Sequence, residues 1–562
     1  MVELHATDVD GVRCFWVETG RPTLAARLIF RAGMADEWLH ESGWMHLLEH
    51  LALHGRGGGA LAVNGATGLL HTSFDAHGPV DHVAHLLGGL THWLGQPEFH
   101  ELEREKSVLA AENALRGSGG AQRALGQRYG SLGPGTAAYP EPGLARATPA
   151  GLAHRAQWAF AQGNAVLVLD GPPPPDLRLF LPPGGLKQPA RAIPCGDTLP
   201  VAYGEEGGLA LSGVVTRSVA ATFLPDLLQE SLHQRLRDGA GAAYAPLATY
   251  EAVDDEHALV IATSDLLPTL LPTIADTALR LVKDLASMGP SPEQLRLIKE
   301  RRWQAMTDPY AASSIAHQAA LEYLRSRSPQ AHEDLLDELA RVSGKEIKEQ
   351  ARVFADTLMI GLPAASRWVG QLPRLEVPHV APELQGDRHR HQDWPAVSAR
   401  LVVSEQGLEI TDRRSARRVL FEDATAVFGY PGGTRTLVSH DGWSVTLDPA
   451  AWHGGAVAVQ ALDGFTPPQL ALSRPATDGQ GGYQRRSFGS RWGTWLGRVL
   501  KPRAGSTLWQ RVMPLAVVVA FAIAVTIVGL PGLPPHWEYW TARIAWAACV
   551  GTVFRTIRGE RV

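Results

Sequence analysis

Cysteine and charge are both scarce in this chain. Cys14, Cys195 and Cys549 are the three cysteines among 562 residues. They lie far apart, which argues against a disulfide framework and against a cysteine-based zinc site. Charged residues make up 19%, and 52 Lys and Arg against 57 Asp and Glu give a net charge of −5. A near-balanced charge excludes a general nucleic-acid binder. With 45% hydrophobic residues, the composition predicts an ordinary folded chain of several domains.

The first residues also lack the features of a cleaved export signal. Met1 to Asp8 contains no basic segment and no apolar run, so we expect no signal peptide. The other end differs, because Val512 to Leu530 is nineteen residues long and carries no formal charge. A helix of that length is roughly 28 Å long, about the thickness of the hydrocarbon core of a bilayer. We therefore predict a transmembrane helix there, with a buried core helix as the alternative.

The flanks of this run predict its orientation. Pro531 to Pro535 ends the helix, and a second apolar stretch, Ile544 to Phe554, is either a return helix or an interfacial helix. Arginine and lysine crowd the segment before residue 512 and recur after residue 554, whereas residues 531–541 contain neither. By the positive-inside rule, both flanks are cytoplasmic. We expect a protein of the cell membrane, anchored at its C-terminus, with its soluble domains on the cytoplasmic side.

Composition breaks divide the chain into segments and predict an α+β fold. Strand-like and helix-like runs alternate in two stretches, which predicts two α/β sandwich domains. Short strand-like runs separated by glycine turns then predict a β-rich module. The expected segments are domains at 1–185 and 198–372, a linker at 373–397, the β-rich module at 398–474, a basic linker at 475–507 and a membrane helix or hairpin at 508–562.

The sharpest chemical signal is an H-x-x-E-H pattern at His46, Glu49 and His50. On a helix, residues four apart project from one face, so both imidazoles can bind one metal ion. Glu49 lies near the same face, where it can accept a proton from a metal-bound water. The alternative is a surface helix with two histidines and a chance glutamate.

A catalytic zinc site needs a third protein ligand. The segment that starts at residue 101 supplies a carboxylate-rich helix start. On spacing alone, each of four glutamates can reach the metal, and a solvated acidic helix start is the alternative reading. These glutamates are Glu101, Glu103, Glu105 and Glu112.

Together the two motifs resemble those of the insulinase/pitrilysin zinc peptidases, which include the mitochondrial processing peptidases. The run Leu102 to Lys106 matches the family's second motif, and the resemblance implies that Glu103 is the third ligand of one Zn²⁺ per chain. Glu105 and Glu112 are then supporting or alternative carboxylates. The interval between His50 and Glu103 is shorter than is usual in the family, and Gly55 to Gly59 replaces what is normally a helix.

The resemblance also implies substrate-binding residues. Asn64 to Thr67 is similar to the family's edge strand, which pairs with the peptide backbone, and Asn64 would donate to the scissile carbonyl. A simple turn residue is the alternative. The segment around Arg237 and Tyr244 is similar to one that contacts the substrate from the second domain. For that pair, an exposed arginine and a core tyrosine are the alternative.

These features predict a membrane-anchored zinc endopeptidase with a peptide substrate and no nucleic-acid partner. A catalytically inactive family member that binds peptides or assists another peptidase chain is the alternative. The family builds a closed chamber from four such domains, so two domains imply a homodimer or a heterodimer with a related chain. The module at 398–474 faintly resembles bacterial pleckstrin-homology-like modules, with an unspecified small barrel as the alternative.

Overall fold

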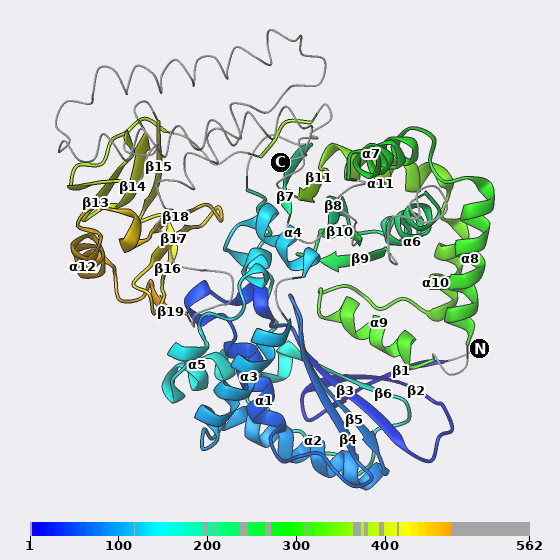
Figure 1. Cartoon of the computed structure of the whole chain (residues 1–562). Helices are drawn as coiled ribbons and strands as arrows, with labels where there is room; N and C mark the ends of the chain where they lie inside the picture. The colour runs from blue at the N-terminus through cyan, green and yellow to red at the C-terminus, as the bar shows by residue number, and fades with distance from the viewer. Residues whose placement is uncertain are drawn as a thin grey trace, which may run out of the picture. The chain divides into compact units, whose positions relative to one another are not determined.

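A computed structural model gives the arrangement of the chain (Figure 1). It describes residues 3–474 except for the gaps 117–118, 196–199, 206–207, 236–245, 265–270, 309–311, 364–371, 376–379, 393–397 and 413–414. The predicted basic linker and the predicted span Val512 to Leu530 therefore lie outside the described residues. Within the described part, no helix has both the length and the apolar character needed to cross a bilayer.

The first half of the chain is built on a six-stranded sheet in the order β1-β2-β6-β3-β5-β4. Its strands are β1 (Leu4–Val9), β2 (Val12–Val17), β3 (Leu24–Phe30), β4 (Ala62–Thr67), β5 (Thr72–Gly78) and β6 (Ala165–Leu169). Side chains alternate across this sheet, as strand geometry requires. Leu24, Ala26 and Leu28 enter one core, whereas Ile29 enters another on the opposite face.

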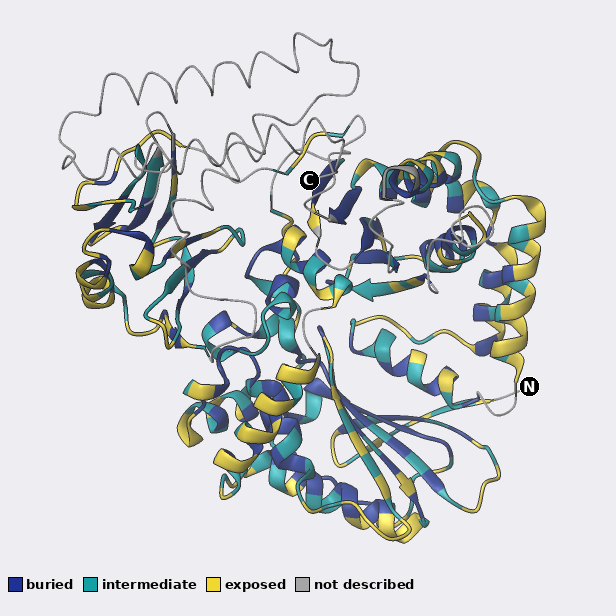
Figure 2. Ribbon diagram, viewed as in Figure 1, coloured by how far each residue is buried: buried dark blue, intermediate teal, exposed yellow. Residues whose placement is uncertain are grey.

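Helices cover the first of these faces. They are α1 (Trp44–Leu53), α2 (Val80–Gly95), α3 (Leu102–Arg116) and α5 (Pro149–Ala159), and α4 (Gly120–Tyr129) follows α3 in the chain. Short 3-10 turns, η1 (Met34–Asp36), η2 (Leu39–Glu41), η3 (Gly133–Ala138), η4 (Leu144–Arg146) and η5 (Gln162–Asn164), connect them. Figure 2 shows that buried residues gather where these helices meet the sheet.

The second half repeats this topology. Its sheet has the order β7-β11-β8-β10-β9, with β7 (Val201–Glu205), β8 (Leu209–Thr216), β9 (Leu247–Ala252), β10 (His257–Ser264) and β11 (Met359–Pro363). One parallel pair is followed by three antiparallel pairs, as in β2-β6-β3-β5-β4. The helices are α6 (Val219–His233), α7 (Leu271–Met288), α8 (Pro292–Thr307), α9 (Ser313–Tyr323), α10 (His332–Arg341) and α11 (Gly344–Asp356). The α+β class expected from the sequence is confirmed.

The two halves exchange helices. Ala316 and Ala320 of α9, from the second half, pack against Val166 and Val168 of the first sheet. Leu125 and Tyr129 of α4, from the first half, pack in turn against Leu259 and Ile261 of the second sheet. Each sheet therefore has one face covered by its own helices and part of the other covered by a helix of its neighbour.

A β-rich module completes the described chain. Its sheets are β12-β13-β14-β15 and β18-β17-β16-β19. The elements are β12 (Asp387–Arg390), β13 (Arg400–Ser404), β14 (Gly407–Asp412), β15 (Ser415–Leu420), β16 (Ala424–Gly429), β17 (Arg435–Ser439), β18 (Ser444–Leu447), η10 (Pro449–Ala451), α12 (Gly455–Phe465) and β19 (Ala471–Ser473). The stretch expected as a linker contains strand β12. Its charged sequence did not predict a strand, but it pairs with β13.

Candidate metal centre

Helix α1 places the H-x-x-E-H residues as the sequence predicted. Apolar positions such as Leu47, Leu48 and Leu51 enter the core of the first half, which leaves the histidine face directed at a cavity of about 1060 Å³. His46 and His50 lie one helical turn apart, with their ring centroids 4.8 Å from each other. Their imidazoles can therefore share one ion.

The start of α1 is held by a buried carboxyl group. Gly43 has φ +95°, and an added Cβ there would lie 2.7 Å from Glu141 Cβ, so glycine is required. The Glu37 side chain accepts from the backbone N–H groups of Gly43 and Met45, at 2.9 and 2.6 Å. Burial raises the pKa of Glu37 to about 8. These bonds satisfy helix-terminal donors and fix the first turn that carries His46.

Helix α3 supplies a carboxylate to this histidine pair. One nitrogen of His46, one of His50 and one oxygen of Glu112 all lie within 4.8 Å of one another. The distance from His50 Nε2 to Glu112 Oε1 is 3.9 Å. Two imidazoles and one carboxylate form the donor set of many catalytic zinc sites, with a fourth position left open. The residues present therefore fit a zinc ion.

The structure does not bring Glu103 to the histidines, which corrects the expected ligand set. Glu103 is 82% exposed, and its Oε1 lies 2.8 Å from Lys106 Nζ. Glu105 and Glu112 are seven residues apart and share one helix face, whereas Glu103 is rotated about 200° from Glu105. Glu101 is also on the outer side, paired with Arg104. Glu112, one of the alternatives, takes the place expected for Glu103.

Carboxylates hold the far nitrogen of each histidine. Glu105 Oε2 lies 3.3 Å from His50 Nδ1, and its Oε1 lies 2.9 Å from His54 Nδ1. Glu141 Oε1 lies 2.7 Å from His46 Nδ1. A carboxylate at Nδ1 fixes the tautomer that offers Nε2 to a metal. The roles of His54 and Glu141 were not anticipated. His54 continues the four-residue spacing of His46 and His50, which was a usable signal.

Glu49 lies next to this centre in a buried setting. Its Oε2 lies 3.9 Å from His46 Nε2 and accepts a hydrogen bond of 3.1 Å from Thr67 Oγ1. Burial raises the pKa of the Glu49 carboxyl group above its ordinary value. A carboxylate of raised basicity beside a metal is suited to accept a proton from a bound water.

Strand β4 passes directly over Glu49. It ends the described sheet and pairs with β5, so its other edge carries the unpaired groups of a sheet edge. Gly65 faces Glu49, and a Cβ at this position would overlap the Glu49 carboxylate. The glycine therefore allows the free edge to approach the centre closely.

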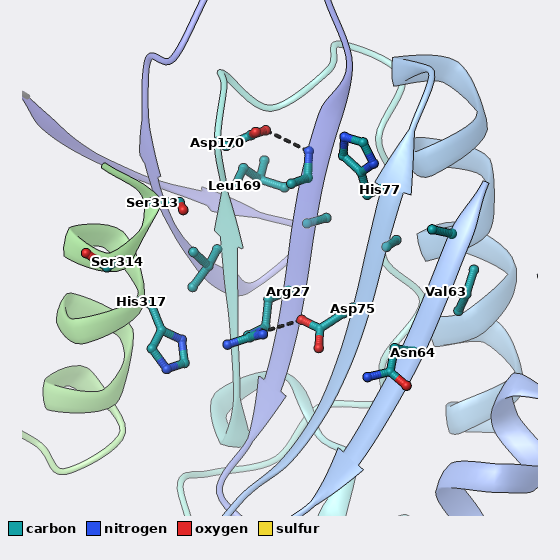
Figure 3. A pocket seen from close by; sticks show the side chains of 15 residues that line it. Arg27, Val63, Asn64, Asp75, His77, Leu169, Asp170, Ser313, Ser314 and His317 are labelled. Carbon is teal, nitrogen blue, oxygen red and sulfur yellow. Dashed lines mark hydrogen bonds and ion pairs between the residues drawn. The ribbon is translucent and has the colours of Figure 1, made fainter. Parts of the chain in front are cut away.

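Asn64 lies on the other face of this strand. It is paired in register with Asp75, which forms an ion pair with Arg27 (Figure 3). These residues line a second cavity of about 530 Å³, which also includes His317 of α9. Gly65 and Thr67 face Glu49, so the alternation of the strand directs the Asn64 side chain away from the centre. Asn64 also contributes to the lining of the large cavity at the metal centre, so its role as a donor to the scissile carbonyl stays a prediction.

The second half contributes to the same large cavity. Thr249 and Glu251 of β9 and Ile261 of β10 line it opposite α1. Burial raises the pKa of Glu251. Arg237 and Tyr244, the expected substrate-binding pair of this half, lie outside the described residues.

Comparisons with known proteins agree with this fold. No protein-family model matches the chain, and no curated protein matches it. Among solved structures, a protease from Helicobacter pylori has a TM-score of 0.54 at 14% identity, covering 64% of this chain and 99% of its own. The peptidase M16 inactive domain from Pseudomonas fluorescens has a TM-score of 0.52 at 16% identity, covering 65% and 99%. A putative M16-like peptidase from Alicyclobacillus acidocaldarius has 0.51 at 15%, covering 65% and 99%.

These matches confirm the resemblance at the level of the fold. The chain has the fold of M16 peptidases, the group that includes pitrilysin. Identities of 14 to 16% show the architecture alone, and one of the similar structures is an inactive domain. The chemistry of this chain must therefore be argued from its own residues.

Proposed function

We propose that the chain is a zinc-dependent endopeptidase that cleaves peptides or small unfolded proteins. The observation that carries this proposal is the group formed by His46, His50 and Glu112, with the buried Glu49 and a free strand edge beside it. Each part matches one requirement of peptide hydrolysis: a metal, a base and a means of holding an extended backbone.

The proposed mechanism assigns a task to each side chain. His46, His50 and Glu112 would hold a Zn²⁺ ion, which when bound would supply a Lewis acid and a water of lowered pKa. Glu49 accepts the proton of that water and delivers it to the leaving amine. The free edge of β4 pairs with the substrate backbone as an added strand, which holds the peptide bond across the centre. Glu105 and Glu141 keep Nδ1 of each histidine engaged and Nε2 available.

The cavity supports an extended peptide as substrate. It has a volume of about 1060 Å³ and is lined by both halves of the chain. A folded protein cannot present its backbone to an edge strand inside such a space, whereas an unfolded segment can. The sequence specificity of cleavage stays open.

A direct test uses a mixed peptide library and the full chain in detergent. Elemental analysis should give about one zinc per chain, and a strong chelator should abolish cleavage. Re-addition of Zn²⁺ should restore it. Cleavage that survives complete removal of metal would overturn the proposal.

A second candidate is an inactive chain that binds peptides for a partner enzyme. The similarity to the inactive domain from Pseudomonas fluorescens motivates it. Intact candidate metal and base positions favour the enzyme. Peptide binding with no cleavage, by a chain shown to hold zinc, would favour the inactive alternative.

We also propose assembly with a second chain, either a copy or a related protein, to close the site. Arg237 and Tyr244 would then contact the substrate held by the partner. Mixing a Glu49→Gln chain with an Arg237→Ala chain should restore part of the lost cleavage. No restoration, with dimers demonstrated, would argue against a shared site in a homodimer and leave the heterodimer.

The membrane anchor is likewise a proposal, based on the uncharged run Val512 to Leu530. A cysteine placed between residues 531 and 540 should react with an impermeant thiol reagent on intact cells, in a Cys549→Ser background. A cysteine placed after Gly559 should stay unreactive if the catalytic domains and the tail are cytoplasmic. Labelling at both positions would place the tail outside the cell.

A further inference from the structure

The segment Tyr139–Glu141 connects the candidate metal centre to the β-rich module. At one end, Glu141 Oε1 lies 2.7 Å from His46 Nδ1, and Glu141 Oε2 accepts a hydrogen bond of 2.8 Å from Asn113 Nδ2. Asn113 directly follows Glu112 in α3. Glu141 therefore contacts one candidate ligand and the neighbour of another.

The backbone of this segment is in an unfavourable conformation. Glu141 has φ +38°, in the left-handed region of backbone conformation that residues other than glycine rarely adopt. Its N–H donates to the Tyr139 carbonyl at 2.7 Å, and two residues later the Gly143 N–H donates to the Ser42 carbonyl at 3.1 Å. Such a conformation persists only where surrounding contacts hold it. The elements that supply those contacts therefore determine the position of Glu141.

The β-rich module supplies several of them. Arg474 Nη1, directly after β19, donates to the Pro140 carbonyl at 2.8 Å. The same guanidinium lies over the Phe428 ring of β16, 5.2 Å from its centroid. Tyr139 packs against Phe428 with their centroids 6.2 Å apart. Burial of Arg474 lowers its pKa, which indicates a desolvated contact.

A shared apolar cluster surrounds this contact. It joins Leu39, from η2, to side chains of the module, with Tyr139 packed against it. The module side chains are Ala426, Phe428, Val438 and Leu472. A second link lies nearby, where Arg146 Nη1 donates to the carbonyls of Pro468 and Gln469 at 3.0 and 2.6 Å. Apolar packing and several hydrogen bonds thus fix the module against the turn that precedes Glu141.

We propose that the β-rich module is a structural support of the metal centre: Arg474 and Phe428 hold Tyr139–Glu141, and Glu141 in turn positions His46. This inference rests on the proposed zinc site. Glu141 and Arg474 are positioning residues, since Arg474 acts through Glu141 and Glu141 through His46. Anything that displaces the module would change the orientation of a metal ligand, which makes the module a means of regulating the proposed activity.

Zinc affinity of the full chain tests this directly. Competition with a chromophoric chelator should show a loss of about 10- to 100-fold for Glu141→Ala, the usual range for a residue that orients a ligand. Arg474→Ala should lose affinity in the same direction by a smaller factor. In the double variant, the two effects should not add, because both act through one segment.

Arg435→Ala is the matched control. Arg435 also lies in the module, and its ion pair is with Asp463 at 2.7 Å. Its removal should leave zinc affinity unchanged. If Arg474→Ala does not fold, as judged by thermal melting, Arg474→Lys replaces it, because lysine keeps the charge and loses the planar guanidinium. Wild-type affinity in a folded Arg474 variant would overturn the role of the module.

Hydrogen exchange on the metal-free chain separates this inference from the proposed function. Peptides that cover residues 138–144 should exchange faster in the Arg474 variant than in wild type or Arg435→Ala. If wild type binds no zinc, the proposed function fails, and this measurement still decides whether the module holds the segment. Unchanged exchange in residues 138–144 would overturn the support role.

Discussion

The two halves of the chain share a sheet topology but use it differently. Helix α1 follows β3 and presents His46, Glu49 and His50 to the cavity. Helix α6 follows β8 in the same position and likewise buries leucines in its own core, namely Leu227, Leu228 and Leu232, but it carries no H-x-x-E-H pattern.

The neighbouring edge strands differ in the same way. Beside α1, the carboxylate of Glu49 accepts from the Thr67 hydroxyl of β4. Beside α6, the amide oxygen of Gln229 accepts from the backbone N–H of Ala248 in β9 at 3.1 Å. The first helix and strand pair therefore forms a candidate centre, whereas the second half lines the same cavity only with residues of β9 and β10. The comparison shows that the shared sheet topology places a helix beside an edge strand in both halves, and that a few side chains on this pair decide whether it can bind a metal.

The largest expected effect comes from removing the candidate base of the first half and comparing the result with a matched change in the second half. Glu49→Gln should retain zinc and lose turnover by at least about 100-fold, the usual scale for a general base. Glu251→Gln is the matched control, because it removes a partly buried carboxyl group that lines the same cavity from the second half. Peptide cleavage and zinc content should be measured for both. Equal losses would mean that the chemistry is not confined to the first half.

The next effect distinguishes between two glutamates of one helix. Glu112→Ala should lower the zinc content well below that of wild type, since it removes a ligand of a three-ligand site. Glu103→Ala should keep the wild-type content, because that side chain is 82% exposed. Elemental analysis after dialysis measures both. Zinc loss in the Glu103 variant alone would restore the ligand expected from the sequence.

A smaller effect is expected where β4 crosses α1. Gly65→Ala should reduce turnover about tenfold at unchanged zinc content, because the added methyl overlaps the Glu49 carboxylate. Gly68→Ala is the control in the same hairpin, since its Cβ would meet the His71 carbonyl at an ordinary 3.5 Å. Turnover that is equal in both variants would show that close approach of β4 to Glu49 is not needed.

The last effect concerns folding stability and the contact between the halves. Burial, with Arg31 and Arg217 nearby, lowers the pKa of His71 to about 3. The unfolded chain then binds more protons below its ordinary pKa of about 6.5, so stability falls as the pH drops. Between pH 6 and 4, His71 should contribute a slope of about 1.4 kcal/mol per pH unit. Denaturant unfolding of wild type and His71→Gln measures it, and parallel slopes would contradict the assignment.

Local patterns predicted the parts of the site that lie close in sequence. His46, Glu49 and His50 share one helix, so a five-residue spacing was sufficient. The placement expected for Glu103 was wrong. The helical spacing could have indicated Glu112, because Leu102, Glu105, Leu109 and Glu112 follow one helix face. Glu141 could not be found in this way, because it reaches His46 from a turn whose conformation depends on the distant module.

The β-rich module shows the same limit. Glycine turns and alternation predicted β13, β14, β15, β17 and β18, whereas β12, β16, β19 and α12 were missed. Strand β12 is charged and pairs at an edge, and α12 contains an Ala-Val-Ala-Val run that is typical of a strand. Tertiary contacts override local preference in both elements.

The exchange of α9 and α4 has a consequence for how the chain responds to cleavage. Each half packs the apolar face of one helix on the sheet of the other, so the connection between residues 170 and 201 is not what keeps the halves together. A chain nicked there by a protease should migrate as one particle until denatured. Two separately expressed fragments should be insoluble alone and reassemble when coexpressed, as a split protein does.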